Sequence, residues 1–161
     1  MSNAFEIRKI QSCDLEWIRS LIRREWGSIQ VVSRGISYNA DSLPGFIAEV
    51  KGIPEGLLTY NIKRRDCEIV TLNSLIERHG IGTALIDAVK KESSRIGCNR
   101  IWLITTNDNV NAIRFYQKAG FSLVAVHRNA IEASRRLKPE IPLVGLHGIP
   151  IRDEIEFELM L

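Results

Sequence analysis

TNDNVNAIRFYQKAGF, residues 106–121, is the stretch that decides the fold of this 161-residue chain. It follows an apolar, β-branched run at residues 100–106, which predicts a central strand buried on both faces. Residues 109–119 predict a helix that Gly120 ends, and residues 121–127 predict the next strand. Strands that alternate with helices in this way predict a sheet with some parallel pairing.

The residues before this stretch predict two further helices and four strands. Apolar residues at helical spacing from Ile81 predict a helix to about Arg95, and Gly97 ends it. Asp14 is positioned to cap an earlier helix, which Gly27 ends. Alternating runs predict a short N-terminal strand and then a three-stranded antiparallel meander, at residues 5–10, 46–50, 56–62 and 67–72.

Two long segments interrupt this order of elements. Residues 28–44 are polar and irregular, and residues 129–150 form a 22-residue excursion that contains three prolines. Apolar residues then alternate with glutamates over residues 154–159, which predicts a final strand. No internal repeat or interdomain linker is visible, so we expect one domain over residues 1–161.

Composition argues against several classes of protein. The 22 lysines and arginines exceed the 19 aspartates and glutamates by only 3, and no basic stripe interleaves with aromatics, so nucleic-acid binding is not expected. No run approaches the roughly 18 apolar residues of a membrane span, and no signal-peptide core is present, which predicts a cytoplasmic protein. Cys13, Cys67 and Cys98 lack the spacing of metal ligands, so we expect reduced thiols and no metal site.

A glycine-containing loop, RHGIGT at residues 78–83, opens the helix that begins at Ile81. Glycines let the backbone approach a ligand closely, and the amides and dipole of a helix N-terminus favour phosphate oxygens. The alternative is a tight strand-to-helix turn that binds nothing. No Gly-Lys-Ser/Thr follows, and Leu85 occupies the third glycine position of a dinucleotide fingerprint, so neither a P-loop nor a Rossmann site is predicted.

Taken together, residues 78–83 and 106–121 resemble the GNAT superfamily of acyl-CoA-dependent N-acyltransferases. In that family a Gln/Arg-x-x-Gly-x-Gly/Ala loop binds the pyrophosphate of coenzyme A, and a strand-end Asn precedes Ala-Ile-x-x-Tyr and Gly-Phe. The resemblance is specific from about Cys67 to Phe121, and Glu77 departs from it where the family has Gln or Arg. It implies a GNAT-like α/β (α+β) fold, with a mixed, mostly antiparallel sheet of about six to seven strands flanked by helices, as a single N-acetyltransferase domain.

The resemblance also implies acetyl-CoA as co-substrate and assigns residues to it. The backbone of the strand end would pair with the pantetheine arm, and the glycine loop would hold the pyrophosphate. Arg78 would supply the positive charge that Glu77 lacks, and Asn109 would contact the cofactor, cap its helix or do both. The implied cofactor-binding residues are Leu72, Asn73, Ser74, Arg78, His79, Gly80, Ile81, Gly82, Thr83, Asn109 and Tyr116.

Tyr116 and Glu68 are the implied catalytic residues. The family reaction is direct attack of a neutral amine on the thioester, which needs a base for the ammonium proton and a proton for the departing thiolate. Tyr116 matches the family tyrosine that donates to the sulfur; alternatively, it packs in the core. Glu68 matches a general base of some members; alternatively, it is a solvated or ion-paired strand residue and a water chain takes the proton.

The acceptor site is harder to assign. In the family it lies between the segment after the first helix and the link between the last two strands, which makes Arg34 and Tyr38 candidate substrate-binding residues. Basic residues of the link either hold an acidic group of the acceptor or form a solvated helix face. Glutamates of the final strand either attract a cationic amine or protect an edge strand. These residues are Arg128, Arg135, Arg136 and Lys138, and Glu154, Glu156 and Glu158.

These features predict an N-acetyltransferase that moves an acetyl group from acetyl-CoA to a primary amine in a ternary complex. The long excursion favours a small amine. The alternatives are acetylation of a protein N-terminus or lysine, a non-catalytic acyl-CoA-binding regulatory module, and a structural domain whose glycine turn binds nothing. The final strand and the excursion are candidate contact surfaces for a homodimer.

Overall fold

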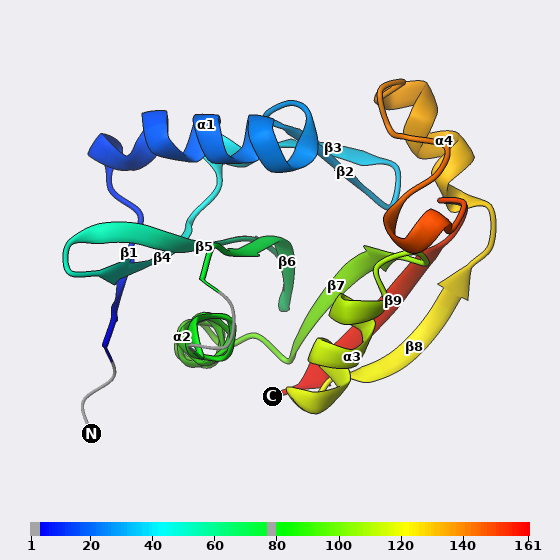
Figure 1. Ribbon diagram of the computed structural model, residues 1–161. Helices are drawn as coiled ribbons and strands as arrows, with labels where there is room; N and C mark the ends of the chain where they lie inside the picture. The colour runs from blue at the N-terminus through cyan, green and yellow to red at the C-terminus, as the bar shows by residue number, and fades with distance from the viewer. Residues whose placement is uncertain (1–3, 77–79) are drawn as a thin grey trace.

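The computed structural model describes residues 4–76 and 80–161. Within these residues the chain forms four α-helices and nine strands, seven of them in one sheet (Figure 1). The helices are α1 (Leu15–Trp26), α2 (Ile81–Ile96), α3 (Val110–Lys118) and α4 (Ala130–Leu137). The strands are β1 (Glu6–Lys9), β2 (Gln30–Ser33), β3 (Ile36–Asn39), β4 (Gly45–Val50), β5 (Ile53–Lys63), β6 (Asp66–Ser74), β7 (Arg100–Thr106), β8 (Ser122–His127) and β9 (Glu154–Met160).

The large sheet is mixed and mostly antiparallel, in the order β1-β4-β5-β6-β7-β9-β8. Neighbouring strands pair antiparallel except β6 and β7, which run parallel because α2 connects them. The predicted meander is present as β4, β5 and β6. The predicted fold class, a mixed and mostly antiparallel sheet of six to seven strands flanked by helices, is therefore confirmed.

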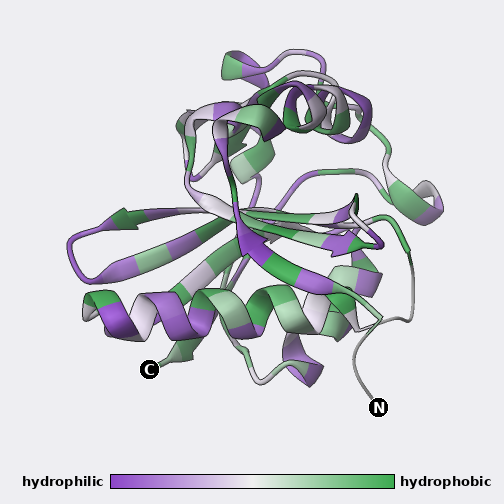
Figure 2. Ribbon diagram, turned by 90° about the vertical axis from the view of Figure 1, so that its left-hand side faces the viewer, coloured by the Kyte–Doolittle hydropathy of each residue, from purple (hydrophilic) through white to green (hydrophobic). Residues whose placement is uncertain are grey.

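Helices cover both faces of the sheet, and each face has its own apolar core. Figure 2 shows α1 end-on above the sheet and α2 lengthwise below it. The core beneath α1 includes Ile18, Leu21 and Ile22, whereas the core on the α2 and α3 side includes Leu85 and Phe157. Amphipathic helices on opposite faces thus bury the sheet, as their 3.6-residue apolar spacing predicts.

The expectation that residues 28–44 are irregular is wrong, because β2 and β3 form a hairpin there. Its two-residue turn at Arg34 and Gly35 has positive φ at both positions, the conformation that suits the twist of a two-residue hairpin. Only Val31 and Ser33 of β2 are buried, so the alternating signal is too short to predict the strand.

Asp14 occupies the N-cap position of α1 as predicted, but its side chain makes no capping hydrogen bond. The Asp14 carboxylate accepts two hydrogen bonds of 2.7 Å from the Arg8 guanidinium and one of 2.7 Å from the Gln11 backbone N–H. Hydrogen bonding to Arg8 lowers the pKa of Asp14. The residue therefore ties β1 to a 3-10 turn before α1, rather than capping α1 itself.

The final strand β9 is an interior strand, so the edge-protection interpretation of its glutamates is wrong. It lies between β7 and β8, and β8 forms the edge of the sheet. Glu158 and Glu156 pair with Arg100, and Glu156 also lies 3.0 Å from the His127 ring.

The apolar strand β7 is buried on one face only, because its other face borders the opening described below.

Candidate active site

Strands β6 and β7 separate at the centre of the sheet. They pair from Asp66 and Arg100 as far as Ile69 and Leu103, and their later residues do not pair with each other. Just there, a register shift against β5 leaves Val70 as an extra residue in β6. A bulge of this kind bends and twists its strand, which turns the end of β6 away from β7.

The separation leaves one backbone edge of β6 unpaired between the two strands. Leu72, Asn73 and Ser74 pair on their other side with β5. Their N–H and C=O groups on the β7 side therefore need another partner, which water or an extended ligand can provide. The residues assigned to the pantetheine arm from the sequence thus lie at an open strand edge.

The N-terminus of α2 supplies unpaired amide groups. Gly80 precedes the helix with φ of +75°, which glycine adopts without strain, and its carbonyl accepts the first helical hydrogen bond from Ala84. The amides of Ile81, Gly82 and Thr83 therefore lack intrahelical partners. A Cβ atom on Gly82 would lie 3.1 Å from the Phe115 ring of α3, so this position favours glycine. Arg78 and His79 lie outside the described residues.

Tyr116 lies in α3 and is 8% exposed. Its ring packs edge-on against Phe115 and Phe121, and near Phe157, with centroid distances of 5.3, 5.7 and 6.1 Å. Burial raises the pKa of the Tyr116 hydroxyl, which therefore stays protonated. The packing interpretation is correct for the ring, and the hydroxyl makes no hydrogen bond to the residues that the structure describes.

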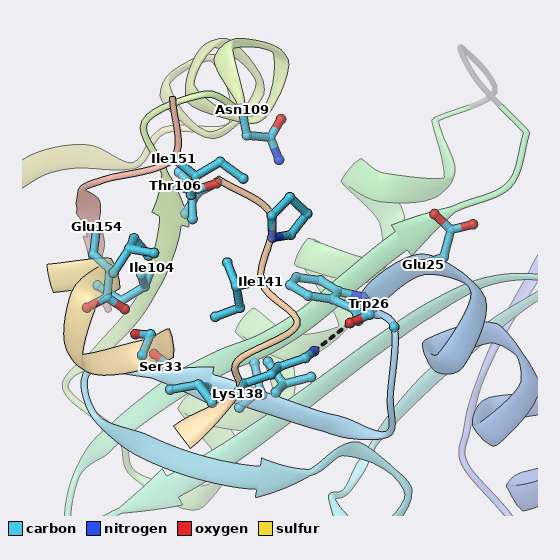
Figure 3. A pocket seen from close by; sticks show the side chains of 18 of the residues that line it. Glu25, Trp26, Ser33, Ile104, Thr106, Asn109, Lys138, Ile141, Ile151 and Glu154 are labelled. Carbon is cyan, nitrogen blue, oxygen red and sulfur yellow. Dashed lines mark hydrogen bonds between the residues drawn. The ribbon is translucent and has the colours of Figure 1, made fainter. Parts of the chain in front are cut away.

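A cavity of about 410 Å³ lies on the α1 side of this opening (Figure 3). Its walls come from the end of α1, from β2, β6, β7 and β9, and from α4 with the segment that follows it. Asn109 borders the cavity and also caps α3, since its side-chain oxygen accepts from the Ala112 N–H at 3.2 Å. The cap interpretation of Asn109 is confirmed.

Two buried carboxylates lie beside the cavity. Glu68, which is 4% exposed, accepts hydrogen bonds from the Ser33 hydroxyl at 2.5 Å and from the Tyr38 hydroxyl at 2.9 Å. Burial raises the pKa of Glu68, and the charges of Glu154 and Glu156 add to this rise, while the two hydrogen bonds oppose it. Ser33 lines the cavity, and Glu68 lies behind it.

Glu154 is the second carboxylate, and it lines the cavity directly. It is 2% exposed and accepts the Arg34 backbone N–H at 3.1 Å and the Arg34 guanidinium at 3.4 Å. Figure 3 shows Glu154 and Ser33 on the same side of the cavity, and Glu25 on the other side. The β2–β3 hairpin thus holds both carboxylates in place.

A segment that we call the roof, residues 138–151, borders the cavity on the α4 side, where five of its residues line the cavity: Lys138, Glu140, Ile141, Pro142 and Ile151. The Lys138 ammonium group donates to the backbone carbonyls of Trp26 and Gln30, and burial lowers its pKa. The Arg135 guanidinium donates to three more backbone carbonyls, of Ile141, Pro142 and Ile151. These two side chains therefore bind backbone rather than an acidic acceptor, and they do not form a solvated helix face.

The roof is also fastened to the end of β7. The Asp108 carboxylate accepts the Leu146 N–H at 2.9 Å. Asn107 donates to the Pro150 carbonyl at 2.9 Å and accepts from the N–H groups of Arg152 and Asp153. Two residues of the stretch that decides the fold thus fix the excursion beside the cavity.

Comparisons with known proteins agree with this geometry. Residues 14–121 match the family model described as Acetyltransferase (GNAT) family. The chain belongs to the GNAT acetyltransferase family. It is 52% identical to the Bacillus subtilis protein YdhI over 136 residues. This matched region covers 83% of this chain and 84% of YdhI.

Solved structures share the GNAT fold at low sequence identity. A GNAT family acetyltransferase from Elizabethkingia anophelis, with acetyl-CoA bound, has a TM-score of 0.73 and 16% identity over 99% of this chain and 100% of its own. The ribosomal-protein-S18-alanine N-acetyltransferase of Escherichia coli has a TM-score of 0.68 and 17% identity. That match covers 97% of this chain and 93% of the Escherichia coli chain. The predicted family and the predicted acyltransferase class are therefore confirmed.

Two absences complete the description of this GNAT protein. No helix in residues 4–76 and 80–161 is long and apolar enough to cross a membrane. The same part of the chain contains no cluster of three or more histidine, cysteine, aspartate or glutamate side chains that could bind a metal ion.

The structure places the sequence-predicted site residues of this GNAT protein in two groups. Of those assigned to the cofactor, Leu72, Asn73 and Ser74 lie at the unpaired edge of β6 and Asn109 borders the cavity, whereas residues 80–83 open α2 and Tyr116 is buried in α3. Arg34 and Tyr38, assigned to the acceptor, instead hold Glu154 and Glu68 and do not line the cavity. Ser33 does line it and was missed, because a lone serine in a polar segment carries no signal in the sequence.

Proposed function

We propose that this GNAT protein transfers an acetyl group from acetyl-CoA to a primary amine by direct attack in a ternary complex. The observation that carries the proposal is the opening between β6 and β7, which joins an unpaired strand edge to a cavity with buried carboxylates. The Elizabethkingia anophelis protein, which has the same fold, binds acetyl-CoA. Acetyl-CoA would supply the thioester that the amine attacks.

The residues at the opening fit such a co-substrate. Leu72, Asn73 and Ser74 offer backbone groups to an extended pantetheine arm, in the manner of an added strand. The amides of residues 81–83 point out of the α2 N-terminus, where they can bind phosphate oxygens. In this proposal Arg78 and His79, which lie outside the described residues, complete the pyrophosphate site, and Asn109 contacts the cofactor while it caps α3.

Glu68 is the base in this proposal, and it acts through Ser33. The ammonium proton passes to the Ser33 oxygen while the Ser33 hydroxyl proton passes to Glu68. Because the pKa of Glu68 is raised, it lies closer to the pH at which the reaction runs, and this favours proton transfer. The neutral amine can then form the new C–N bond as the C–S bond breaks.

Tyr116 completes the mechanism on the other face of the opening. Because its raised pKa keeps the hydroxyl protonated, it can donate a hydrogen bond to the sulfur as negative charge develops there. N–H groups at the unpaired edge of β6 can polarise the thioester carbonyl. The proton that the attacking nitrogen loses as the amide forms goes to the departing thiolate, so free coenzyme A thiol is released and no covalent enzyme intermediate forms.

A calorimetric titration with acetyl-CoA tests the co-substrate. The parent should bind saturably, and Gly82→Glu should weaken binding by about 100-fold or more, because its carboxylate would obstruct and repel the pyrophosphate. Gly82→Ala is the matched control, since it brings the same Cβ contact with Phe115 without the charge. A folded parent that does not bind acetyl-CoA would overturn the proposal.

A further inference from the structure

The cavity beside Glu154 is small and mostly apolar. Its volume of about 410 Å³ is in the range of pockets that hold small ligands. Aliphatic side chains from four elements and the roof line it: Val32, Val70, Ile104, Ile131, Ile141 and Ile151. A molecule held there gains most of its binding free energy from burial of apolar surface.

The polar groups of this cavity favour one sign of charge. Lys138 is the one basic residue among the lining residues that the structure describes, and its ammonium group already donates to two backbone carbonyls. Glu154 accepts two hydrogen bonds, both from Arg34, and a carboxylate has about four acceptor sites. An ammonium group would find a partner at Glu154, whereas a carboxylate would meet three lining glutamates, Glu25, Glu140 and Glu154, and one ammonium group with a single N–H left to donate.

The roof limits the size of the acceptor. Residues 138–151 border the cavity, and seven hydrogen bonds attach this segment to the rest of the domain. Six are donated by the side chains of Arg135, Lys138 and Asn107, and the Asp108 carboxylate accepts the seventh. Gly145 lies against Asp108 so closely that a Cβ atom there would be 2.1 Å from the carboxylate oxygen. A peptide chain would need to displace this fastened segment, whereas a compact molecule would not.

Building on the acetyltransferase function proposed above, we infer that the acceptor is a compact primary amine with an apolar body and no acidic group, held in the cavity with its ammonium group at Glu154. Free amino acids are poor acceptors because their carboxylate would lie among three glutamates, and the one lining ammonium group, that of Lys138, already donates to two backbone carbonyls. Protein amines are poor acceptors because a peptide chain would need to displace the roof.

Three probe molecules test the acceptor class on the unmodified protein. 2-Phenylethylamine has the proposed features, L-phenylalanine adds a carboxylate to the same skeleton, and an unblocked alanine-initiated peptide represents a protein N-terminus. The kcat/KM for 2-phenylethylamine should exceed that for either competitor by about 100-fold or more. Equal or faster acetylation of the amino acid or the peptide would overturn the inference.

Calorimetry separates this inference from the proposed function. Binding of 2-phenylethylamine is measured without any nucleotide, so it does not depend on acetyl-CoA. It should be at least about tenfold tighter than that of L-phenylalanine. Acetyl-CoA binding with no preference for the apolar amine would overturn the acceptor class alone, and preference for the amine without acetyl-CoA binding would overturn the proposed function alone.

A pair of variants tests the role of Glu154. Glu154→Gln should raise the KM for 2-phenylethylamine by about 10- to 100-fold, as expected for loss of a charged hydrogen bond, and leave acetyl-CoA affinity unchanged. Glu158→Gln removes the same charge from the same strand, where Glu158 pairs with Arg100 away from the cavity, and should retain the parent KM. An unchanged KM in Glu154→Gln would show that the ammonium group binds elsewhere.

Discussion

The cofactor side and the acceptor side of the β6–β7 opening are built differently. On the cofactor side, the groups available to a ligand are backbone amides and carbonyls of β6 and α2, with glycines at the closest approach. On the acceptor side, side chains bind groups from distant parts of the chain: Ser33 binds Glu68, Arg34 binds Glu154, and Lys138 binds the backbone carbonyl of Trp26. The first side therefore depends on backbone geometry and on small residues where α2 begins, and the second depends on individual side-chain pairs.

The largest effect is expected at Glu68, on the acceptor side. Glu68→Gln should lower kcat by about 1,000-fold, the usual scale for loss of a general base, because the proton from the amine would have no acceptor behind Ser33. Acetyl-CoA affinity should not change, since the carboxylate lies off the unpaired edge of β6. Thiol release measures the rate, and an unaltered pH–rate profile would remove Glu68 from the mechanism.

Tyr116→Phe is expected to have the next largest effect. Loss of the hydroxyl should lower kcat by about 100-fold, because the departing sulfur would lose its hydrogen-bond donor. The midpoint of unfolding should stay at the parent value, since the hydroxyl makes no hydrogen bond to the described residues and the ring packing is retained. Full turnover in this variant would leave Tyr116 with a packing role only.

Removing the Lys138 ammonium group tests whether the roof depends on that one pair of contacts. Lys138→Met leaves the carbonyls of Trp26 and Gln30 without this donor and should lower the free energy of unfolding by about 2 kcal/mol. Urea unfolding measures the change. Lys91→Met, an exposed substitution on α2, is the control and should change stability by no more than about 0.5 kcal/mol. Equal effects of the two substitutions would contradict a fastening role for Lys138.

The smallest effect is the pH dependence of stability from Glu68. Its pKa is raised in the folded state, so at low pH both states hold the proton and the burial carries no penalty. As pH rises from the unfolded pKa through the folded pKa, the unfolded state releases its proton first, and the parent loses stability. The midpoint of thermal unfolding of the parent should therefore fall relative to that of Glu68→Gln as the pH rises above 4.5, the ordinary pKa of a glutamate. A constant difference between the two proteins would contradict the raised pKa.

Much of the fold, and the local structure of the proposed cofactor side, could be predicted from the sequence, because both depend on neighbouring residues. The apolar stripe from Ile81 and the stop at Gly97 predict the bounds of α2 to within one residue. Gly80 and Gly82 lie where this helix begins. The separation of β6 from β7 could not be predicted, because it depends on the register of β6 against β5, where Val70 is the extra residue.

The acceptor side could not be assembled from the sequence, because its contacts join residues far apart in the chain. Ser33 lies 35 residues from Glu68, and Arg34 lies 120 residues from Glu154. Each residue alone has an ordinary explanation: a serine in a polar segment, a glutamate on a strand. The capping role of Asp14 failed for a local reason, since Arg8, six residues earlier on β1, binds the carboxylate that would have capped α1.

The most direct test of acetyl transfer is a measurement of both products in one reaction. The parent and Glu68→Gln are each incubated with acetyl-CoA and 2-phenylethylamine, and free coenzyme A thiol and N-acetylated amine are quantified together. We predict equal amounts of the two products with the parent, and a fall of both in Glu68→Gln. Thiol release without acetylated amine, or saturable acetyl-CoA binding with no transfer to any amine, would contradict the assignment of this chain as an amine acetyltransferase.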